Sequence, residues 1–138
     1  MSTSPADFNI QVIEEFRAND GRVGGMLAGM PLVLVHHKGA KSGVERVNPL
    51  AYLEDDGRYV VFASKAGAPD HPAWYHNLKM HPSTKIELGA DTIPVVASEA
   101  HGDERHRLYR TMTEASPQFG EYQEKTDRTI PVMILTPA

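Results

Sequence analysis

The chain has 138 residues, a length that suits a single domain with its own hydrophobic core. Its 14 Lys and Arg stand against 18 Asp and Glu, and the net charge of −4 argues against a general nucleic-acid surface, so any anion site must be local. The absence of cysteine excludes disulfides, thiolate zinc sites and cysteine nucleophiles, and it fits a cytoplasmic protein. We find no signal-peptide pattern and no apolar run of membrane-spanning length, so we expect no integral membrane contact.

The first 30 residues are expected to form a helix and a flexible connection. Apolar residues at helical spacing predict a helix over Asp7–Ala18, and they are Phe8, Val12, Ile13 and Phe16. The glycines of residues 21–29 predict a flexible link to the rest of the chain. The apolar face of the helix packs on the core or touches a membrane surface, so peripheral membrane association stays open.

Short segments rich in β-branched and aromatic residues dominate the remainder of the chain. The predicted strands are Leu32–His37, Arg46–Leu53, Arg58–Ser64, Lys85–Leu88, Thr92–Ser98 and Ile130–Leu135. Turn signals at Asp56-Gly57 and at Gly89–Asp91 predict two antiparallel hairpins, one between the second and third strands and one between the fourth and fifth. Helices are predicted over Pro72–Met80 and Asp103–Ala115.

Strands of this number and length leave fewer open edges when they close on themselves. We therefore predict an α+β protein built on a small barrel of about six mostly antiparallel strands in residues 31–138. The N-terminal helix and the other helices lie at its periphery, and residues 1–30 and 31–138 together form one domain.

The connection between the first two strands gathers positive charge. Residues 36–46 include two glycines and three cations, which are Lys38, Lys41 and Arg46. Glycine lets backbone amides turn toward an anion, and the cations add charge, so this loop is a candidate site for a phosphodiester or for carboxylates. A solvated hairpin with ordinary surface lysines is the alternative.

A second candidate segment, Ala63–Pro69, consists mostly of small residues that leave the backbone accessible. A flat heteroaromatic ring would fit such a floor, with Ser64 and free amides bonding its polar edge, and a plain loop is the alternative. Trp74 and Asn77 lie one helical turn apart, so they either face the same cleft or pack in the core.

Phe119 and Tyr122 lie three residues apart before the last strand, so a short helix would present both to one cavity. Tyr122 either donates a proton or hydrogen bond to a substrate there or anchors the helix to the sheet. The seven histidines do not favour a metal site, because pairs such as His71 and His76 miss the helical i, i+4 spacing.

Four blocks of the sequence, taken in order, are informative together. They are Gly39–Leu50, Ala63–Ala68, Trp74–Lys79, and Tyr122-Gln123 with Thr126–Pro131. In this register they resemble the deazaflavin-dependent nitroreductase family of actinobacteria, and the likeness spans nearly everything after Gly24. The resemblance implies a split β-barrel related to FMN-binding oxidoreductases, with reduced coenzyme F420 as the hydride donor.

The same resemblance implies roles by position. Lys41 and Arg46, helped by Lys38, would meet the phosphate and the oligoglutamate tail of the coenzyme. The ring, the ribityl chain and the pocket edges would be lined by Pro49, Ala63, Ser64, Lys65, Ala66, Gly67, Trp74 and Asn77. Tyr122 and Ser64 would be the catalytic residues, and no metal is required. The implied reaction transfers hydride from reduced F420 to a quinone, an activated enone or a nitro compound.

One region departs from the pattern of the resembled family. Members that activate bicyclic nitroimidazoles carry several tyrosines before the last strand, where this chain has Ser116 and Phe119 and keeps Tyr122. We expect these three residues to line an apolar substrate pocket that favours quinones or enones. The alternative function is a non-catalytic split-barrel module that binds F420, FMN or haem, and we expect a monomer or a weak homodimer.

Overall fold

The computed structural model describes residues 5–24 and 31–138. Its helices are α1 (Pro5–Ala18), the short 3-10 helix η2 (Lys65–Gly67), α2 (Ala73–Met80), α3 (Gly102–Ala115) and α4 (Gln118–Glu124). Its strands are β1 (Leu32–Lys38), β2 (Glu45–Asp55), β3 (Arg58–Phe62), β4 (Ser83–Leu88), β5 (Asp91–Ala100) and β6 (Val132–Pro137). The expected connection of residues 21–29 lies largely outside the described residues.

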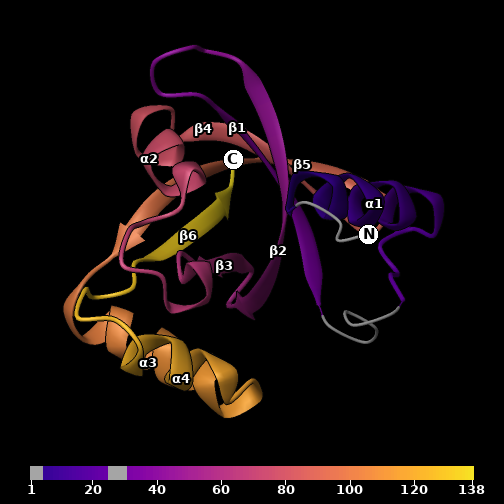
Figure 1. Ribbon diagram of the computed structural model, residues 1–138. Coiled ribbons are helices and arrows are strands. Elements are labelled where there is room, and N and C mark those ends of the chain that lie inside the picture. The colour runs from indigo at the N-terminus through magenta and orange to yellow at the C-terminus, as the bar shows by residue number, and fades with distance from the viewer. Residues whose placement is uncertain (1–4, 25–30) are drawn as a thin grey trace.

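The six strands form a closed antiparallel barrel in the order β1-β2-β3-β6-β5-β4 (Figure 1). Closure comes from β1 and β4, where Leu34 pairs with Glu87 and Val35 with Ile86. Both predicted hairpins are confirmed, because β2 pairs with β3 and β4 with β5. The predicted α+β barrel is therefore confirmed, although β3 ends at Phe62 and leaves Ala63 and Ser64 to the following segment.

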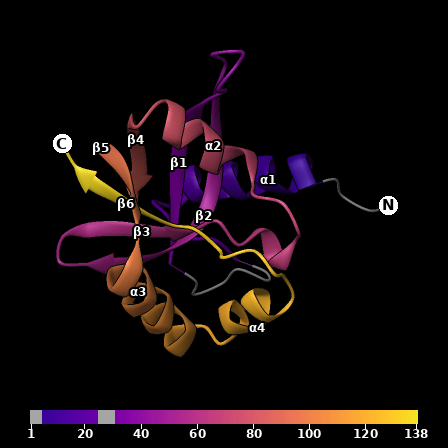
Figure 2. The same ribbon diagram turned by 90° about the vertical axis from the view of Figure 1, so that its left-hand side faces the viewer.

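Helices cover the barrel on different sides, so the buried residues form three apolar clusters. One cluster fills the barrel interior and extends to Trp74 and Leu78 of α2. A second lies between the outer face of β3 and β6 and the helices α3 and α4, which lie together at one side of the barrel in Figure 2. The third joins α1 to β1. Both ends of the segment that connects β3 to α2 are thus anchored to packed elements, through Ala63 and Trp74.

Helix α1 packs on the barrel through part of its apolar face. Phe16 is fully buried against Leu34, and Arg17 forms a bidentate bond with Glu87 of β4 at 3.0 and 2.7 Å. Phe8 and Ile10 remain 40% and 53% exposed. The predicted helix is confirmed, and its core-facing side chains are those nearest its C-terminal end. No helix within the described residues is long and apolar enough to cross a membrane.

Strand β1 is buried on both faces, since α1 covers one and the barrel interior the other. A strand covered on both faces has a continuous apolar sequence, which explains the run Leu32–Val35. Alternation then sends His36 and His37 to opposite faces. The two histidines consequently belong to two different hydrogen-bond networks.

Candidate functional site

The basic loop between β1 and β2 is held by a side chain of α2. The backbone N–H of Ala40 donates to Asn77 Oδ1 at 2.9 Å, and Asn77 Nδ2 lies 2.9 Å from His37 Nδ1. His37 Nε2 lies 2.7 Å from Asn48 Oδ1 on β2. Asn77 is buried and uses both halves of its amide in this chain, so it acts as a support for the loop rather than as a free ligand group.

The direction of these bonds determines the protonation of His37. Because Asn77 Oδ1 accepts from Ala40, its Nδ2 must donate, and His37 Nδ1 must accept. The ring proton is then on Nε2, which donates to Asn48. Burial lowers the pKa of His37 below its usual 6.5, and the positive charge of Arg46 lowers it further, although the bond to Asn48 acts in the opposite direction. A neutral His37 is therefore part of the loop's architecture.

On the opposite face of β1, His36 engages two acidic residues. Its Nδ1 lies 3.0 Å from Glu45 Oε1 and its Nε2 lies 2.7 Å from Glu87 Oε2, which also binds Arg17. The hydrogen bond from His36 lowers the pKa of the Glu45 carboxyl, helped by the charge of Lys85. The carboxylate at the start of β2 is thus already bound to His36.

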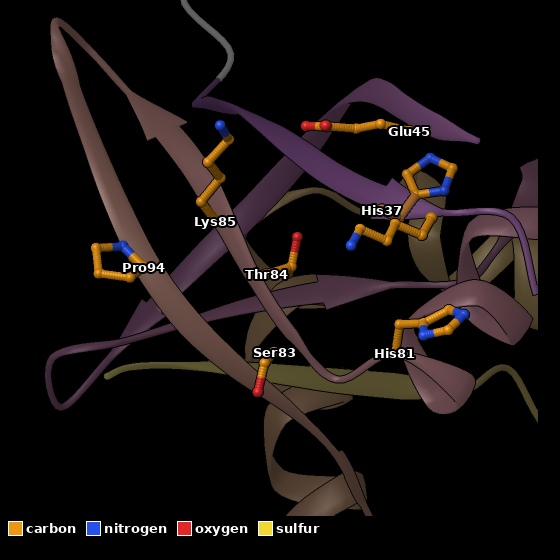
Figure 3. A pocket seen from close by; sticks show the side chains of 8 residues that line it. His37, Glu45, His81, Ser83, Thr84, Lys85 and Pro94 are labelled. Atoms are coloured by element: carbon orange, nitrogen blue, oxygen red, sulfur yellow. The ribbon is translucent and has the colours of Figure 1, made fainter. Parts of the chain in front are cut away.

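Positive charge remains unpaired around this loop. Within the described part of the chain, no carboxylate lies within ion-pair distance of Lys38, Lys41, Arg46 or Lys85. Lys38 and Lys85 line a pocket of about 350 Å³ (Figure 3), which also includes His81 and Ser83. Figure 3 shows Ser83, Thr84 and Lys85 in a row along β4. This surface suits a ligand with several negative charges.

The segment after β3 has an unusual backbone. Ser64 is right-handed (φ −76°, ψ −37°), and three left-handed residues follow it: Lys65 (φ 45°), Ala66 (φ 54°) and Gly67 (φ 81°). A right-handed residue followed by a left-handed one turns successive N–H groups to the same side and creates an anion-binding nest. The N–H groups of Ser64, Lys65 and Ala66 have no acceptor among residues 5–24 and 31–138. Among the described residues these three N–H groups are therefore left without a hydrogen-bond partner.

This conformation is strained, because a left-handed non-glycine residue costs about 1–2 kcal/mol. The guanidinium of Arg128 opposes that strain. It donates to Ala63 O at 3.1 Å, Ser64 O at 2.8 Å and Ala68 O at 2.8 Å, and it lies 2.9 Å from His71 Nδ1. Sequence reasoning assigned Arg128 no role, although it lies in one of the informative blocks, because nothing local marks an arginine as a partner of carbonyls 60 residues away.

The structure brings the segment after β3 against α4, which carries Tyr122. A Cβ on Gly67 would lie 2.8 Å from Tyr122 O and 2.9 Å from Lys125 Cβ, so only glycine fits there. The Tyr122 ring is half-buried, 5.4 Å from Phe119, and its hydroxyl makes no hydrogen bond within the described residues. The predicted short helix is confirmed, and it places the backbone of Tyr122 next to the nest.

The three residues expected to line the substrate pocket lie in different environments. Phe119 is a core residue, 5.6 Å from the ring of Phe62 and only 6% exposed. Ser116 lies at a cavity of about 400 Å³ between β2 and the end of α3, together with Leu53 and Met112. Ala63–Gly67 line neither this cavity nor the pocket beside Lys38. Tyr122 is therefore the one of the three that lies beside the nest.

Trp74 and Pro49, which were expected to bound one pocket, lie apart. Trp74 is 5% exposed and packs in the cluster that fills the barrel. Pro49 pairs with Leu34 and shares its face of the sheet, which is the face opposite Asn48. Among the described side chains, no group of three or more His, Asp or Glu is arranged to hold a metal ion.

Comparison with known proteins connects this arrangement to a family. The sequence matches the F420H2-dependent quinone reductase family over residues 10–137. An F420H2-dependent quinone reductase of Mycobacterium tuberculosis is 37% identical over 125 residues, covering 88% of this chain and 84% of that protein. A solved F420-H2 dependent reductase is 44% identical with a TM-score of 0.70, covering 76% of this chain and 93% of the other.

A second solved structure, described as a domain-swapped dimer, is 40% identical with a TM-score of 0.72 and covers 96% of this chain and 99% of its own. The range matched by the family, residues 10–137, includes the basic loop, the nest and α4. The chain therefore belongs to the F420H2-dependent quinone reductase family.

Proposed function

We propose that this protein is an F420H2-dependent reductase that passes hydride from the reduced deazaflavin to a hydrophobic acceptor. The proposal rests on two features of the barrel that suit anionic or polar ligand groups. One is the set of cations in the β1–β2 loop, which have no ion-pair partner among the described residues, and the other is the nest of unbonded amides at Ser64–Ala66. F420 has a phosphate and a glutamate tail at one end and a ring with a polar edge at the other. When bound, it supplies the hydride.

The loop suits the acidic end of the coenzyme. Lys41 and Arg46 would bind the phosphate and the first carboxylates, and Lys38 would continue this surface toward the pocket that holds Lys85. The tail remains remote from the reacting ring, so these cations contribute affinity rather than chemistry. The chain Ala40–Asn77–His37–Asn48 keeps the loop in place before the coenzyme arrives.

The nest suits the ring. The amides of Ser64, Lys65 and Ala66 would donate to oxygen atoms on its polar edge, and the exposed Ala66 presents only a methyl group, which leaves room for a flat group. Helix α4 places the backbone of Tyr122 beside this segment, and the Tyr122 hydroxyl is unpaired among the described residues, so we expect it to donate a hydrogen bond or proton to the reduced acceptor. The Ser64 hydroxyl would add a second donor.

The acceptor is proposed to be a quinone or an activated enone in preference to a nitroimidazole. Ser116 and Phe119 supply no phenol at their positions, which leaves Tyr122 as the phenol that this segment retains. Purified protein with reduced F420 should therefore reduce menadione faster than a bicyclic nitroimidazole. Equal rates with both acceptors would contradict this preference.

One cuvette assay tests the proposal as a whole. Reduced F420, protein and menadione are mixed, and the return of the oxidised coenzyme's absorbance is followed. Turnover supports the reductase. Binding of F420 without turnover would favour the non-catalytic module, and stoichiometric binding of FMN in the same assay would favour a flavin in its place. No heat of F420 binding in calorimetry would contradict the proposal altogether.

We further propose a cytoplasmic monomer or weak homodimer, with α1 and the barrel as parts of one domain. The solved relative described as a domain-swapped dimer motivates the test of assembly. Light scattering across a tenfold range of protein concentration distinguishes the states, and a tight dimer at every concentration would contradict this assignment. Flotation with anionic vesicles tests peripheral contact through the exposed Phe8 and Ile10.

A further inference from the structure

We propose that Arg128 is a positioning residue: by binding the carbonyl side of the peptide units, it orients the amide N–H groups of the coenzyme-binding nest. The inference rests on the proposed function for its ligand, but its geometric basis lies within the protein. Arg128 lies between α4 and β6, and its side chain reaches the segment after β3. Four of its five N–H groups have acceptors there, three of which are backbone carbonyls.

Because the peptide bond is planar, a contact that fixes a carbonyl also fixes the direction of the N–H group in the same peptide unit. In a trans peptide the carbonyl of one residue and the N–H of the next point in opposite directions, and the described chain has no cis bond. The carbonyl of Ala63 is bound to Arg128, so the N–H of Ser64 points away from it. The carbonyl of Ser64 is bound as well, so the N–H of Lys65 also points away. Two of the three nest amides are therefore aimed by one guanidinium.

The same contacts enclose the strained residues. Ala63 and Ser64 precede the left-handed residues Lys65 and Ala66, and Ala68 follows Gly67. Arg128 holds carbonyls on both sides of this turn at 2.8 to 3.1 Å, which fixes the turn at both ends. A cation on the carbonyl side also polarises each peptide unit, so its N–H becomes a stronger donor toward a ligand.

Arg128 is itself held by its neighbours. Gln123 Nε2 donates to Arg128 O at 2.7 Å, and Gln123 Oε1 accepts from Ile130 N at 3.0 Å and from Arg105 Nη2 at 2.9 Å. Arg105 also donates to Ile130 O. The backbone on both sides of Arg128 is thus tied to α3 and α4. The guanidinium has little freedom, so the position of the nest follows from that of α4 and Tyr122.

Arg128→Lys tests the proposal, because it keeps the positive charge and removes the planar fork that reaches three carbonyls. The matched control is Arg110→Lys on α3, an exposed arginine without a hydrogen bond or ion pair among the described residues. In the ligand-free protein, amide exchange measured by NMR should rise about tenfold at Gly67 and Ala68, whose N–H groups bond to Ser64 O and Lys65 O. Amides of β1 and β6 should keep their protection.

The ligand-binding arm uses the same variants. The dissociation constant of F420 should rise about tenfold in Arg128→Lys and stay unchanged in Arg110→Lys. In Arg128→Ala, free guanidinium at about 10 mM should recover part of the affinity, while methylammonium at the same concentration should not, because only a planar fork fits the three carbonyls. A residue that merely stabilises the fold would show no such selectivity.

Three results would overturn the proposal: unchanged exchange at Gly67 and Ala68 in Arg128→Lys, unchanged F420 affinity despite faster exchange there, or equal loss of protection in every strand. The exchange experiment needs no coenzyme. If the unmodified protein fails to bind F420, the proposed function fails, while the exchange data still decide whether Arg128 holds the turn.

Discussion

Side chains that bind backbone groups determine the geometry of the candidate site. Asn77 holds Ala40 in the basic loop, and Arg128 holds the carbonyls of Ala63 and Ser64. Neither side chain is required to touch the coenzyme, since each positions the groups that would. The ligand groups themselves, the cations of the loop and the amides of the nest, are left without partners by the described protein.

Removing a cation from the basic loop should weaken coenzyme binding more than it slows hydride transfer. Lys41→Ala and Arg46→Ala should each raise the F420 dissociation constant about fivefold to tenfold, because each loses a charge-assisted contact. The value of kcat should change less than about twofold, since the tail is remote from the reacting ring. Calorimetry and steady-state kinetics measure the two effects. An unchanged dissociation constant in both variants would remove the loop from the site.

Replacing the hydroxyl of Tyr122 should have the opposite effect. Tyr122→Phe keeps the ring that packs against Phe119 and removes the proposed hydroxyl donor. We expect kcat to fall about tenfold or more, while the F420 dissociation constant stays within about twofold. Steady-state kinetics with menadione and fluorescence titration separate the two values. A fall in affinity with kcat intact would make Tyr122 a binding residue.

The neutral state of His37 predicts a pH dependence of stability. The unfolded chain takes up a proton near the usual pKa of 6.5, whereas the folded His37 has a lowered pKa. The contribution of neutral His37 to the free energy of unfolding should therefore be at its maximum above about pH 6.5 and should fall as the pH drops below that value. His71, whose pKa is lowered by burial and by Arg128, adds to the same trend.

Urea unfolding at about pH 7.5 and pH 5.5 measures this trend. In His37→Gln the difference between the two pH values should shrink, because the glutamine amide does not titrate. Gln also retains donor and acceptor groups at this position. An equal difference in both proteins would show that His37 is protonated to the same extent in the folded and unfolded states.

Elements position the site through the way they cover the barrel. Helix α2 supplies Asn77 to the basic loop, and α4 packs against the nest through Gly67. On the opposite face of β1, α1 fills the space beside Leu34 and binds Glu87, which in turn contacts His36. The networks around His37 and His36 meet at β1 and β2, so the basic loop begins and ends in strands that are held from both faces.

Truncation of Phe16 tests how firmly α1 is attached. Phe16 is fully buried, so Phe16→Ala should lower the free energy of unfolding by about 3–5 kcal/mol. The control is Ile10→Ala on the same helix, which is 53% exposed and should change stability by less than about 0.5 kcal/mol. Urea unfolding measures both variants. Similar small losses would show that α1 does not contribute to the stability of the barrel.

At the scale of the whole molecule, we propose that one coenzyme spans two segments that are far apart in sequence. The basic loop and the nest are separated by β2 and β3; the loop is bonded to α2 through Asn77, and the nest packs against α4 through Gly67. A coenzyme that touches both would bind the folded state only, because the unfolded chain has no fixed distance between them.

Coenzyme binding should therefore stabilise the fold. At a free concentration of 100 times its dissociation constant, F420 should raise the free energy of unfolding by about 2.7 kcal/mol. Thermal or urea unfolding with and without coenzyme measures the change, and the Arg46→Ala variant at the same F420 concentration provides the control. An increase in stability that is equal in the variant would place the coenzyme away from the loop.

Much of the fold follows from local signals in the sequence. The alternation of β-branched residues, the Asp56-Gly57 turn and the run Leu32–Val35 predicted strands and hairpins close to those observed. The charge of the β1–β2 loop and the small residues after β3 likewise marked both halves of the candidate site. These features are local because turns, strand periodicity and loop charge depend on residues close together in the chain.

Tertiary structure alone decided which groups are free to meet a ligand. The sequence by itself determined the barrel class, the basic loop, the small-residue floor and the family resemblance. It did not determine that the amide of Asn77 is hydrogen-bonded to His37 and Ala40, or that Phe119 belongs to the core. Nor did it determine that Arg128 binds the carbonyls behind the nest amides. Those outcomes depend on contacts between residues 37 to 65 positions apart, which exist only once the barrel has closed.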